Sequence, residues 1–290
     1  MMKDDTKERV VSYYEATHRW YRLFWYTPAD LALHYGFWDE TTRTRSDALR
    51  NENRFLAEVA QIRRTDYILD AGCGVGGSAI WLAEHYGCRV MGISINPSHI
   101  AAAKENAAEN SVDHLTAFEI RDYTATGFPD GVFDVVWAIE SFCHAAKPER
   151  LWREVWRILK PGGRLIVADG FQRHPARNKK EQRIFTAFLK GLAVPPPLFL
   201  WKDLKGTLEK IGFQNIRQRD MTHAIARSSR GIFWLCLMWT PLVPVTLMLY
   251  PLRPHFVRIM FNNWRAGIAQ WKALRLGLWN YGVYCAEKVR

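Results

Sequence analysis

The chain has 290 residues, of which 48% are hydrophobic and 24% charged, a composition that excludes a disordered, fibrous or polytopic membrane protein. Its formal net charge of +11 is unevenly spread, because residues 173–290 hold 20 Lys and Arg side chains and only five Asp and Glu. We therefore expect this section of the chain to face, or to pack near, something anionic.

We expect residues 1–60 to form a helical N-terminal arm. This arm is rich in aromatic side chains, including Tyr14 and Tyr35. The first ten residues are charged and polar, unlike a secretory signal or a transit peptide. The five cysteines lie far apart and show no metal-ligand spacing: Cys73, Cys88, Cys143, Cys236 and Cys285. These features favour a cytoplasmic, reducing environment and no bound metal.

Between residues 67 and 169, short apolar runs alternate with helical stretches, which is typical of βαβ units and a parallel sheet. The expected strands are 67–72, 89–95, 114–120, 132–140 and 163–170, and the expected helices are 78–87, 98–110 and 148–163. The pattern predicts an α/β fold with a Rossmann-like, doubly wound sheet of about seven strands, whose main core spans 61–172.

The remaining segments are expected to alternate between core and cap. The prolines at 195–197 predict an irregular cap segment over 173–200. A helix over 201–213 and a short strand near 214–218 return the chain to the core over 201–220. A hydrophobic and basic insertion over 221–277 then forms a second cap, and 278–290 supplies the final core strand.

The strongest motif is LDAGCGVGG at 69–77, at the end of an expected strand and the start of an expected helix. Glycines at such a junction let the backbone turn sharply and approach a ligand, with helix N–H groups facing it. The spacing fits the G-x-G-x-x-G fingerprint of dinucleotide sites. It fits the D-x-G-x-G-x-G pattern of S-adenosylmethionine enzymes equally well.

The positions of the acidic residues distinguish these two ligands. A dinucleotide site needs a carboxylate about 20 residues further on to hold the ribose, and 91–96 contains none. Instead Asp70 precedes the glycines, where it can hold the loop and a methionine amine. Asp122 follows the third strand, a position suited to the adenine amine. The sequence therefore favours S-adenosylmethionine as cofactor.

Two further motifs, FDVVWAIESFCHA at 133–145 and LKPGGRLIVAD at 159–169, complete the set in order. Over about 67–170 the chain resembles the class I S-adenosylmethionine-dependent methyltransferases. The stretch 138–163 is similar to sterol C-methyltransferases, and GISINPSHI at 92–100 to the sterol, tocopherol and cyclopropane-fatty-acid group. The arm segments VVSYYEATHRWYRLFW and HYGFW resemble the entry arm of that group.

The motifs and the resemblance together assign residues to the cofactor. They are Asp70, Gly72, Cys73, Gly74, Gly76, Ser94, Ile95, Asp122, Tyr123 and Glu140. Asp70 precedes the loop formed by Gly72 to Gly76, and the others lie at or just after the ends of the second, third and fourth strands.

Three residues are candidates for the chemical step. Glu140 follows the fourth strand at the carboxyl edge of the sheet, where it can stabilise a cation or accept a proton; a capping role is the alternative. His144 can accept a proton from an oxygen nucleophile, or be satisfied locally. Tyr14 can close over the site from the arm, or belong to the core. Cys143 is a conceivable nucleophile, but sulfonium chemistry needs none.

Residues 231–252 form a run of 22 residues without a charge, long enough to span a bilayer. The prolines at 241, 244 and 251 argue against one straight helix. Three interpretations stay open: a lid over an apolar substrate, a peripheral membrane surface with cationic flanks, or a single span.

The resemblance implies methyl transfer to a hydrophobic small molecule, with C-methylation of a sterol-like or prenyl isoprenoid through a carbocation as the main hypothesis. O- or N-methylation of an amphipathic metabolite or quinone-type ring is the alternative. A nucleic-acid partner is disfavoured, because the basic residues alternate with long apolar runs. The oligomeric state stays open.

Overall fold

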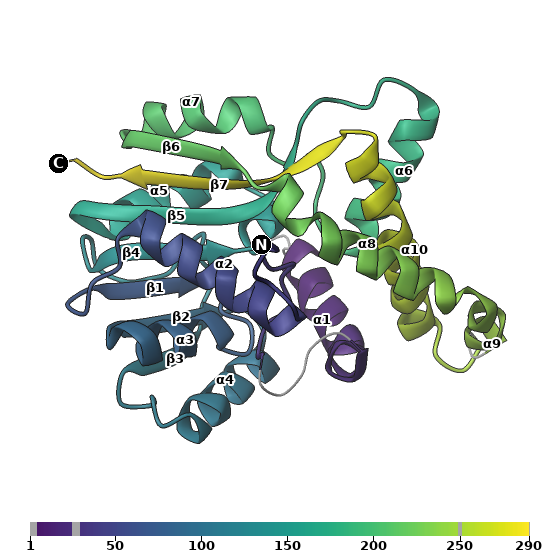
Figure 1. The fold of residues 1–290 in the computed structure, drawn as a ribbon, viewed down its shortest axis with the longest axis horizontal. Helices are drawn as coiled ribbons and strands as arrows, with labels where there is room; N and C mark the ends of the chain where they lie inside the picture. Colours follow the sequence, from purple (N-terminus) through teal and green to yellow (C-terminus); the bar gives the residue numbers. More distant parts are fainter. Residues whose placement is uncertain (1–4, 25–29, 249–250, 290) are drawn as a thin grey trace.

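The computed structural model of the protein describes residues 5–24, 30–248 and 251–289. Its strands are β1 (Tyr67–Ala71), β2 (Arg89–Ser94), β3 (Thr116–Ile120), β4 (Phe133–Ile139), β5 (Leu159–Gln172), β6 (Gln214–Asp220) and β7 (Trp279–Glu287). They form one sheet in the order β3-β2-β1-β4-β5-β7-β6, and helices cover both faces (Figure 1).

Strands β1 to β5 are parallel, and β7 runs antiparallel to both of its neighbours. This topology confirms the predicted Rossmann-like α/β fold with about seven strands. The strand order reverses between β1 and β4, and α/β folds bind ligands beyond the carboxyl ends of the strands at such a point.

The core helices are α3 (Gly77–Tyr86), α4 (Pro97–Glu109), α5 (Pro148–Ile158) and α7 (Trp201–Ile211). One predicted boundary is wrong: the helix expected over 148–163 ends at Ile158, and β5 begins at once with Leu159. Pro161 disfavours helical backbone at the residue before it, so the chain becomes extended earlier than its apolar pattern suggests.

Alternate side chains of the strands enter two apolar layers. Ile68 and Val135 join the layer that also contains Leu56 of the arm. Leu69 and Val136 join the opposite layer with residues of α5 and α7. Because both faces are buried, the parallel strands are continuous apolar runs, which made them easy to predict.

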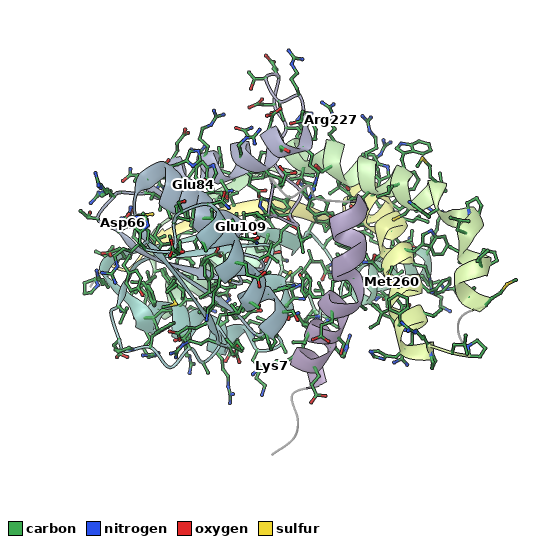
Figure 2. The ribbon with its side chains drawn as sticks, turned by 90° about the horizontal axis from the view of Figure 1, so that it is seen from below. Lys7, Asp66, Glu84, Glu109, Arg227 and Met260 are labelled. Carbon is green, nitrogen blue, oxygen red and sulfur yellow. The ribbon has the colours of Figure 1, made fainter. Side chains whose placement is uncertain are left out.

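The arm contains α1 (Asp5–Phe24) and α2 (Arg45–Ala60). Helix α2 begins with a capping box, in which the Thr44 and Asp47 side chains each accept a backbone N–H of the other residue. Figure 2 shows α1, with Lys7 at one end, between the sheet and the cap helices, and Met260 on the cap side of it. The arm also has aromatic residues at 20, 21 and 24–26, and they lie outside the part of the chain whose side chains are described.

The cap is more regular than the sequence predicted. The segment 173–200, expected to be irregular, contains α6 (Lys179–Gly191) because Asn178 caps a helix that buries Phe185 and Phe188. The insertion contains α8 (Thr222–Met238), a 3₁₀ turn (Thr240–Leu242), α9 (Val243–Met248) and α10 (Pro254–Arg275). A Cβ at Gly191 would collide with the carbonyl oxygen of Asn262, so this glycine lets α6 and α10 pack closely.

The prolines of the uncharged segment coincide with breaks in its helices. Helix α8 ends before Pro241, Pro244 lies in the first turn of α9, and Pro251 lies in a turn before α10. Among the helices in the described ranges, none is both long enough and apolar enough to cross a bilayer.

Candidate functional site

A first cavity of about 290 Å³, here called the glycine-loop cavity, lies beyond the carboxyl ends of β1, β2 and β4. Asp70, the second-last residue of β1, lies at the base of the cavity and is buried, and burial raises the pKa of this carboxyl to about 7. Its Oδ2 atom has no hydrogen-bond partner among the described residues. A buried, unpaired carboxylate oxygen fits the ammonium group of an amino acid.

The loop after Asp70 leaves room for a ligand at one glycine and for the arm at another. Gly74 has φ +52 and lines the cavity, and a Cβ built there would meet no described atom within 4 Å. At Gly77 a Cβ would instead collide with the carbonyl oxygen of Leu31. The arm therefore closes over the start of α3, while the space at Gly74 stays available to a ligand.

The far side of this cavity is formed by the segments of chain that follow β2 and β3. Asp122 lines the cavity, and one of its carboxylate oxygens lies 2.5 Å from the ammonium nitrogen of Lys7 in α1. Burial alone would raise the pKa of Asp122, but hydrogen bonds from Lys7 and Thr124 lower it. Asp122 therefore stays ionised and joins the arm to the sheet.

A second cavity of about 480 Å³, here called the apolar cavity, lies between the sheet and the cap helices α6, α8 and α10. Ten aromatic residues line it: Tyr13, Tyr14, Tyr35, Phe188, Trp239, Phe256, Phe261, Trp264, Trp279 and Tyr281. Within the described ranges no Lys or Arg side chain lines it. This cavity fits an apolar molecule better than one with an anionic group.

The two cavities share a wall made of Tyr14, Leu33, Glu140 and His144. The hydroxyl of Tyr14 lies 3.3 Å from Nε2 of His144. Burial lowers the pKa of His144 to about 4, so its imidazole is neutral at pH 7. The structure thus brings the three predicted catalytic residues together at the only place where the two described cavities meet.

Glu140 has φ +46, in the left-handed region that residues other than glycine rarely adopt. Its Oε1 accepts hydrogen bonds from the backbone N–H of Tyr35 at 2.8 Å and from the hydroxyl of Tyr281 at 3.0 Å. Burial, with the nearby Glu52 carboxylate, raises the pKa of Glu140 well above its ordinary value. Its ionised form therefore becomes more favourable when a cation binds nearby.

The hydrogen bonds continue behind Glu140 into a buried cluster. The Tyr281 hydroxyl also lies 2.7 Å from Glu52, whose other oxygen lies 2.6 Å from Nδ1 of His34. His34, Glu52 and Glu140 offer ligand atoms within 4.8 Å of one another, which by itself would fit a metal ion. Because these atoms already bond to one another, to Tyr281 and to backbone N–H groups, we assign the cluster to a proton-sharing network.

Two neighbouring polar residues have structural partners. The carboxylate of Asp169 accepts the backbone N–H groups of Cys143 and Gly170, at 2.9 and 2.7 Å. Burial raises the pKa of Asp169 to about 6 and that of the Cys143 thiol well above its ordinary value. A thiol that resists ionisation is a poor nucleophile, so Cys143 is unsuited to that role.

Nine of the ten predicted cofactor residues line the glycine-loop cavity: Asp70, Gly72, Cys73, Gly74, Ser94, Ile95, Asp122, Tyr123 and Glu140. The structure does not place Gly76 there. Gly76 caps α3, and a Cβ on it would press against Ala103 and the Phe118 ring.

Several lining residues were not predicted, among them Leu33, Asn96 and His99. Asn96 carried a recognisable signal, because it stands before Pro97 and caps α4. Leu33 and His99 carried none, since only the folded arm and the orientation of α4 bring them to the cavity.

The chain is similar to known methyltransferases in sequence. The sequence model of a family described as "Methyltransferase domain" matches residues 69–167. Sterol 24-C-methyltransferase of Saccharomyces cerevisiae is 31% identical over 224 residues, which cover 76% of this chain and 58% of that protein. Sarcosine/dimethylglycine N-methyltransferase of Halorhodospira halochloris is 29% identical over 227 residues, covering 77% of this chain and 78% of the relative.

The chain spans less than two thirds of the length of the sterol methyltransferases that it matches. Among solved structures, the cyclase SpnF has a TM-score of 0.75 at 21% identity, covering 97% of this chain and 96% of SpnF. Geranyl diphosphate C-methyltransferase from Streptomyces coelicolor A3(2) has a TM-score of 0.73 at 16% identity and covers both chains completely. At such identities the structural likeness shows the fold alone. The domain match and the sequence relatives show that residues 69–167 form a methyltransferase domain.

Proposed function

We propose that the protein methylates a hydrophobic small molecule bound in the apolar cavity, and that S-adenosylmethionine binds in the glycine-loop cavity. The observation that carries this proposal is the shared wall of Tyr14, Leu33, Glu140 and His144. Methyl transfer requires the donor and acceptor atoms to lie in line with water excluded, and two cavities that meet at one wall suit that requirement.

The residues of the glycine-loop cavity fit the two ends of this cofactor. The unpaired Oδ2 of Asp70 suits the amino group, and the open space at Gly74 suits the amino-acid part next to it. Asp122 suits the adenine amine, because its ionised carboxylate lines the same cavity after β3. When bound, S-adenosylmethionine supplies an electrophilic methyl group on a positively charged sulfur.

For the acceptor we propose an isoprenoid without a charged group, methylated on carbon. An alkene carbon would form the new C–C bond with its π electrons as the methyl–sulfur bond breaks and its electron pair stays on the departing thioether, which leaves a carbocation on the substrate. The aromatic walls stabilise this cation, and Glu140 takes the proton as a C–H bond breaks and its electrons restore an alkene. Because no Lys or Arg lines the described part of the cavity, a sterol-like molecule fits better than a prenyl diphosphate.

O- or N-methylation of an amphipathic ring is the second candidate, and His144 is the observation that favours it. Its imidazole is buried, neutral at pH 7 and hydrogen-bonded to Tyr14, so it can accept the proton of a hydroxyl nucleophile. For either substrate we propose a cytoplasmic enzyme with peripheral access to a membrane, because such substrates partition into lipid.

The proposed function is tested by incubating the purified protein with methyl-labelled S-adenosylmethionine and either a lipid or an aqueous extract. We expect label in the neutral lipid fraction, since the apolar cavity offers no partner for an anionic group. Label that accumulates only in the aqueous fraction would contradict the proposed substrate class.

Replacing Gly74 with Ala should weaken cofactor binding, because its Cβ would occupy the space proposed for the ligand. Gly162 is a matched control: it has φ +76, and a Cβ there also meets nothing within 4 Å. Each substitution should cost about 1–2 kcal/mol of stability for the left-handed backbone. Calorimetric titration should show weaker cofactor binding in Gly74→Ala alone, and equal weakening in both variants would place the effect in the backbone.

Replacing Asp122 with Ala should weaken cofactor binding by about 1.5–3 kcal/mol, or roughly tenfold to a hundredfold, because a charge-assisted hydrogen bond is lost. Lys7→Ala separates this role from the tethering of the arm, since it breaks the same ion pair but leaves the carboxylate in place. We expect near-parent affinity in Lys7→Ala. Equal losses in both variants would show that Asp122 acts only by holding α1.

Replacing Glu140 with Gln should lower turnover by about a hundredfold or more, because the shape stays while the proton acceptor is lost. The melting temperature should stay near the parent value, since Gln can still accept hydrogen bonds from Tyr35 and Tyr281.

The contrasting variant for this experiment is Asp169→Asn. In the parent protein the Asp169 carboxylate accepts hydrogen bonds from two backbone N–H groups. We expect that variant to lose stability. Near-full activity in Glu140→Gln would show that Glu140 is not the proton acceptor. That result would favour His144 in this role and, with it, oxygen methylation.

A further inference from the structure

The exposed apolar side chains of this protein are concentrated in one part of the cap. Eleven large apolar side chains are exposed among the described residues, and eight of them lie between Trp234 and Leu252. Met238, Met248 and Leu252 each keep more than 70% of their surface exposed. We call these eight exposed side chains the apolar patch. A concentration of this kind marks an interaction surface rather than ordinary surface variation.

The chain around this patch carries positive charge without compensation. The sequence contains no Asp or Glu between Asp220 and Glu287, but it contains seven Lys and Arg. Arg230 lies before the patch and Arg253 directly after it, and both are exposed. An apolar surface with cationic flanks complements a surface that is apolar inside and anionic at its edge.

The apolar cavity reaches the protein surface within this same patch. Leu242, Val245 and Leu247 line the cavity, and they are 47%, 57% and 42% exposed. Figure 1 shows their segment at the end of the cap that lies farthest from the sheet, around α9. The cavity therefore has an apolar rim, and a molecule that enters there crosses apolar side chains rather than the charged surface.

The helices of the patch are too short and too broken to insert through a membrane. Helix α8 ends at Met238 and α9 has six residues, with Pro241 and Pro244 at the break. Broken helices leave backbone groups that hydrocarbon cannot satisfy, whereas the headgroup region can satisfy them. The patch is thus suited to lying in the membrane interface.

We propose that the apolar patch docks on an anionic lipid bilayer, so that the rim of the apolar cavity opens directly toward the acyl chains. The delivery of substrate by this route rests on the proposed function. The docking itself does not, because it requires neither a cofactor nor a substrate, and it can be measured separately.

The test is sedimentation of the full-length protein with vesicles, in the absence of cofactor. We expect binding to vesicles of phosphatidylcholine with about one third phosphatidylserine, and at least tenfold weaker binding to phosphatidylcholine alone. Raising the salt concentration should weaken binding to the anionic vesicles, because it screens the flanking arginines.

The informative variant is Met238→Glu/Leu252→Glu, which places two charges in the patch without altering the lining of the cavity. Its matched control is Ile120→Glu/Val289→Glu, which changes two exposed apolar side chains outside the cap. We expect the first variant to bind anionic vesicles at least tenfold more weakly than the control, with unchanged circular dichroism and cofactor affinity in both.

Brominated phosphatidylcholine in the same vesicles gives a second readout, because it quenches tryptophan that reaches the acyl region. The exposed Trp234 should account for part of this quenching, so Trp234→Phe should reduce it. Absence of binding to anionic vesicles, or equal losses in both double variants, would overturn the proposal. So would a lipid-free dimer that Met238→Glu/Leu252→Glu converts to monomer, since the patch would then be a protein interface.

Discussion

The structure depends on one constraint, the need to hold the Glu140 carboxylate in the wall where two cavities meet. A carboxylate removed from water must be hydrogen-bonded or neutral, and Glu140 has both hydrogen-bond donors and a raised pKa that favours its neutral form. The backbone of Tyr35 and the hydroxyl of Tyr281 donate to it, and its raised pKa keeps its charge costly until a cation is near. These two donors come from the arm and from the last strand, so the site forms only when both chain ends are in place.

This constraint explains why the backbone at Glu140 is strained. A left-handed φ at a residue other than glycine costs on the order of 1–3 kcal/mol, and surrounding contacts must enforce it. The N–H of Glu140 bonds to the carbonyl of Ala168 at 2.8 Å, which continues the pairing of β4 with β5 to the edge of the sheet. The side chain is thereby turned out of the strand direction and into the wall between the cavities, so that it lines both of them.

The sequence was informative where a local pattern determines structure. The parallel strands are buried on both faces, so their apolar runs were visible, and the glycine loop with Asp70 located the first cavity. The sequence was uninformative where partners lie far apart. The hydrogen bond between Tyr281 and Glu52 joins residues 229 positions apart, and no sequence motif predicts it. Helix α6 was missed because three prolines beyond its end dominated the interpretation of the whole segment.

The cap creates two different electrostatic environments with one insertion. Its basic side chains lie on the outside, while the cavity that it covers presents aromatic rings and no described Lys or Arg. A cation that develops inside such a cavity is stabilised by ring faces and by one carboxylate, without repulsion from a nearby ammonium or guanidinium group. The same separation leaves the external charge free to attract anionic partners, and it leaves the apolar rim uncharged. The cap thus separates an exposed positive charge from a cavity lined by aromatic rings, which is the arrangement that the proposed cation chemistry and the proposed docking both require.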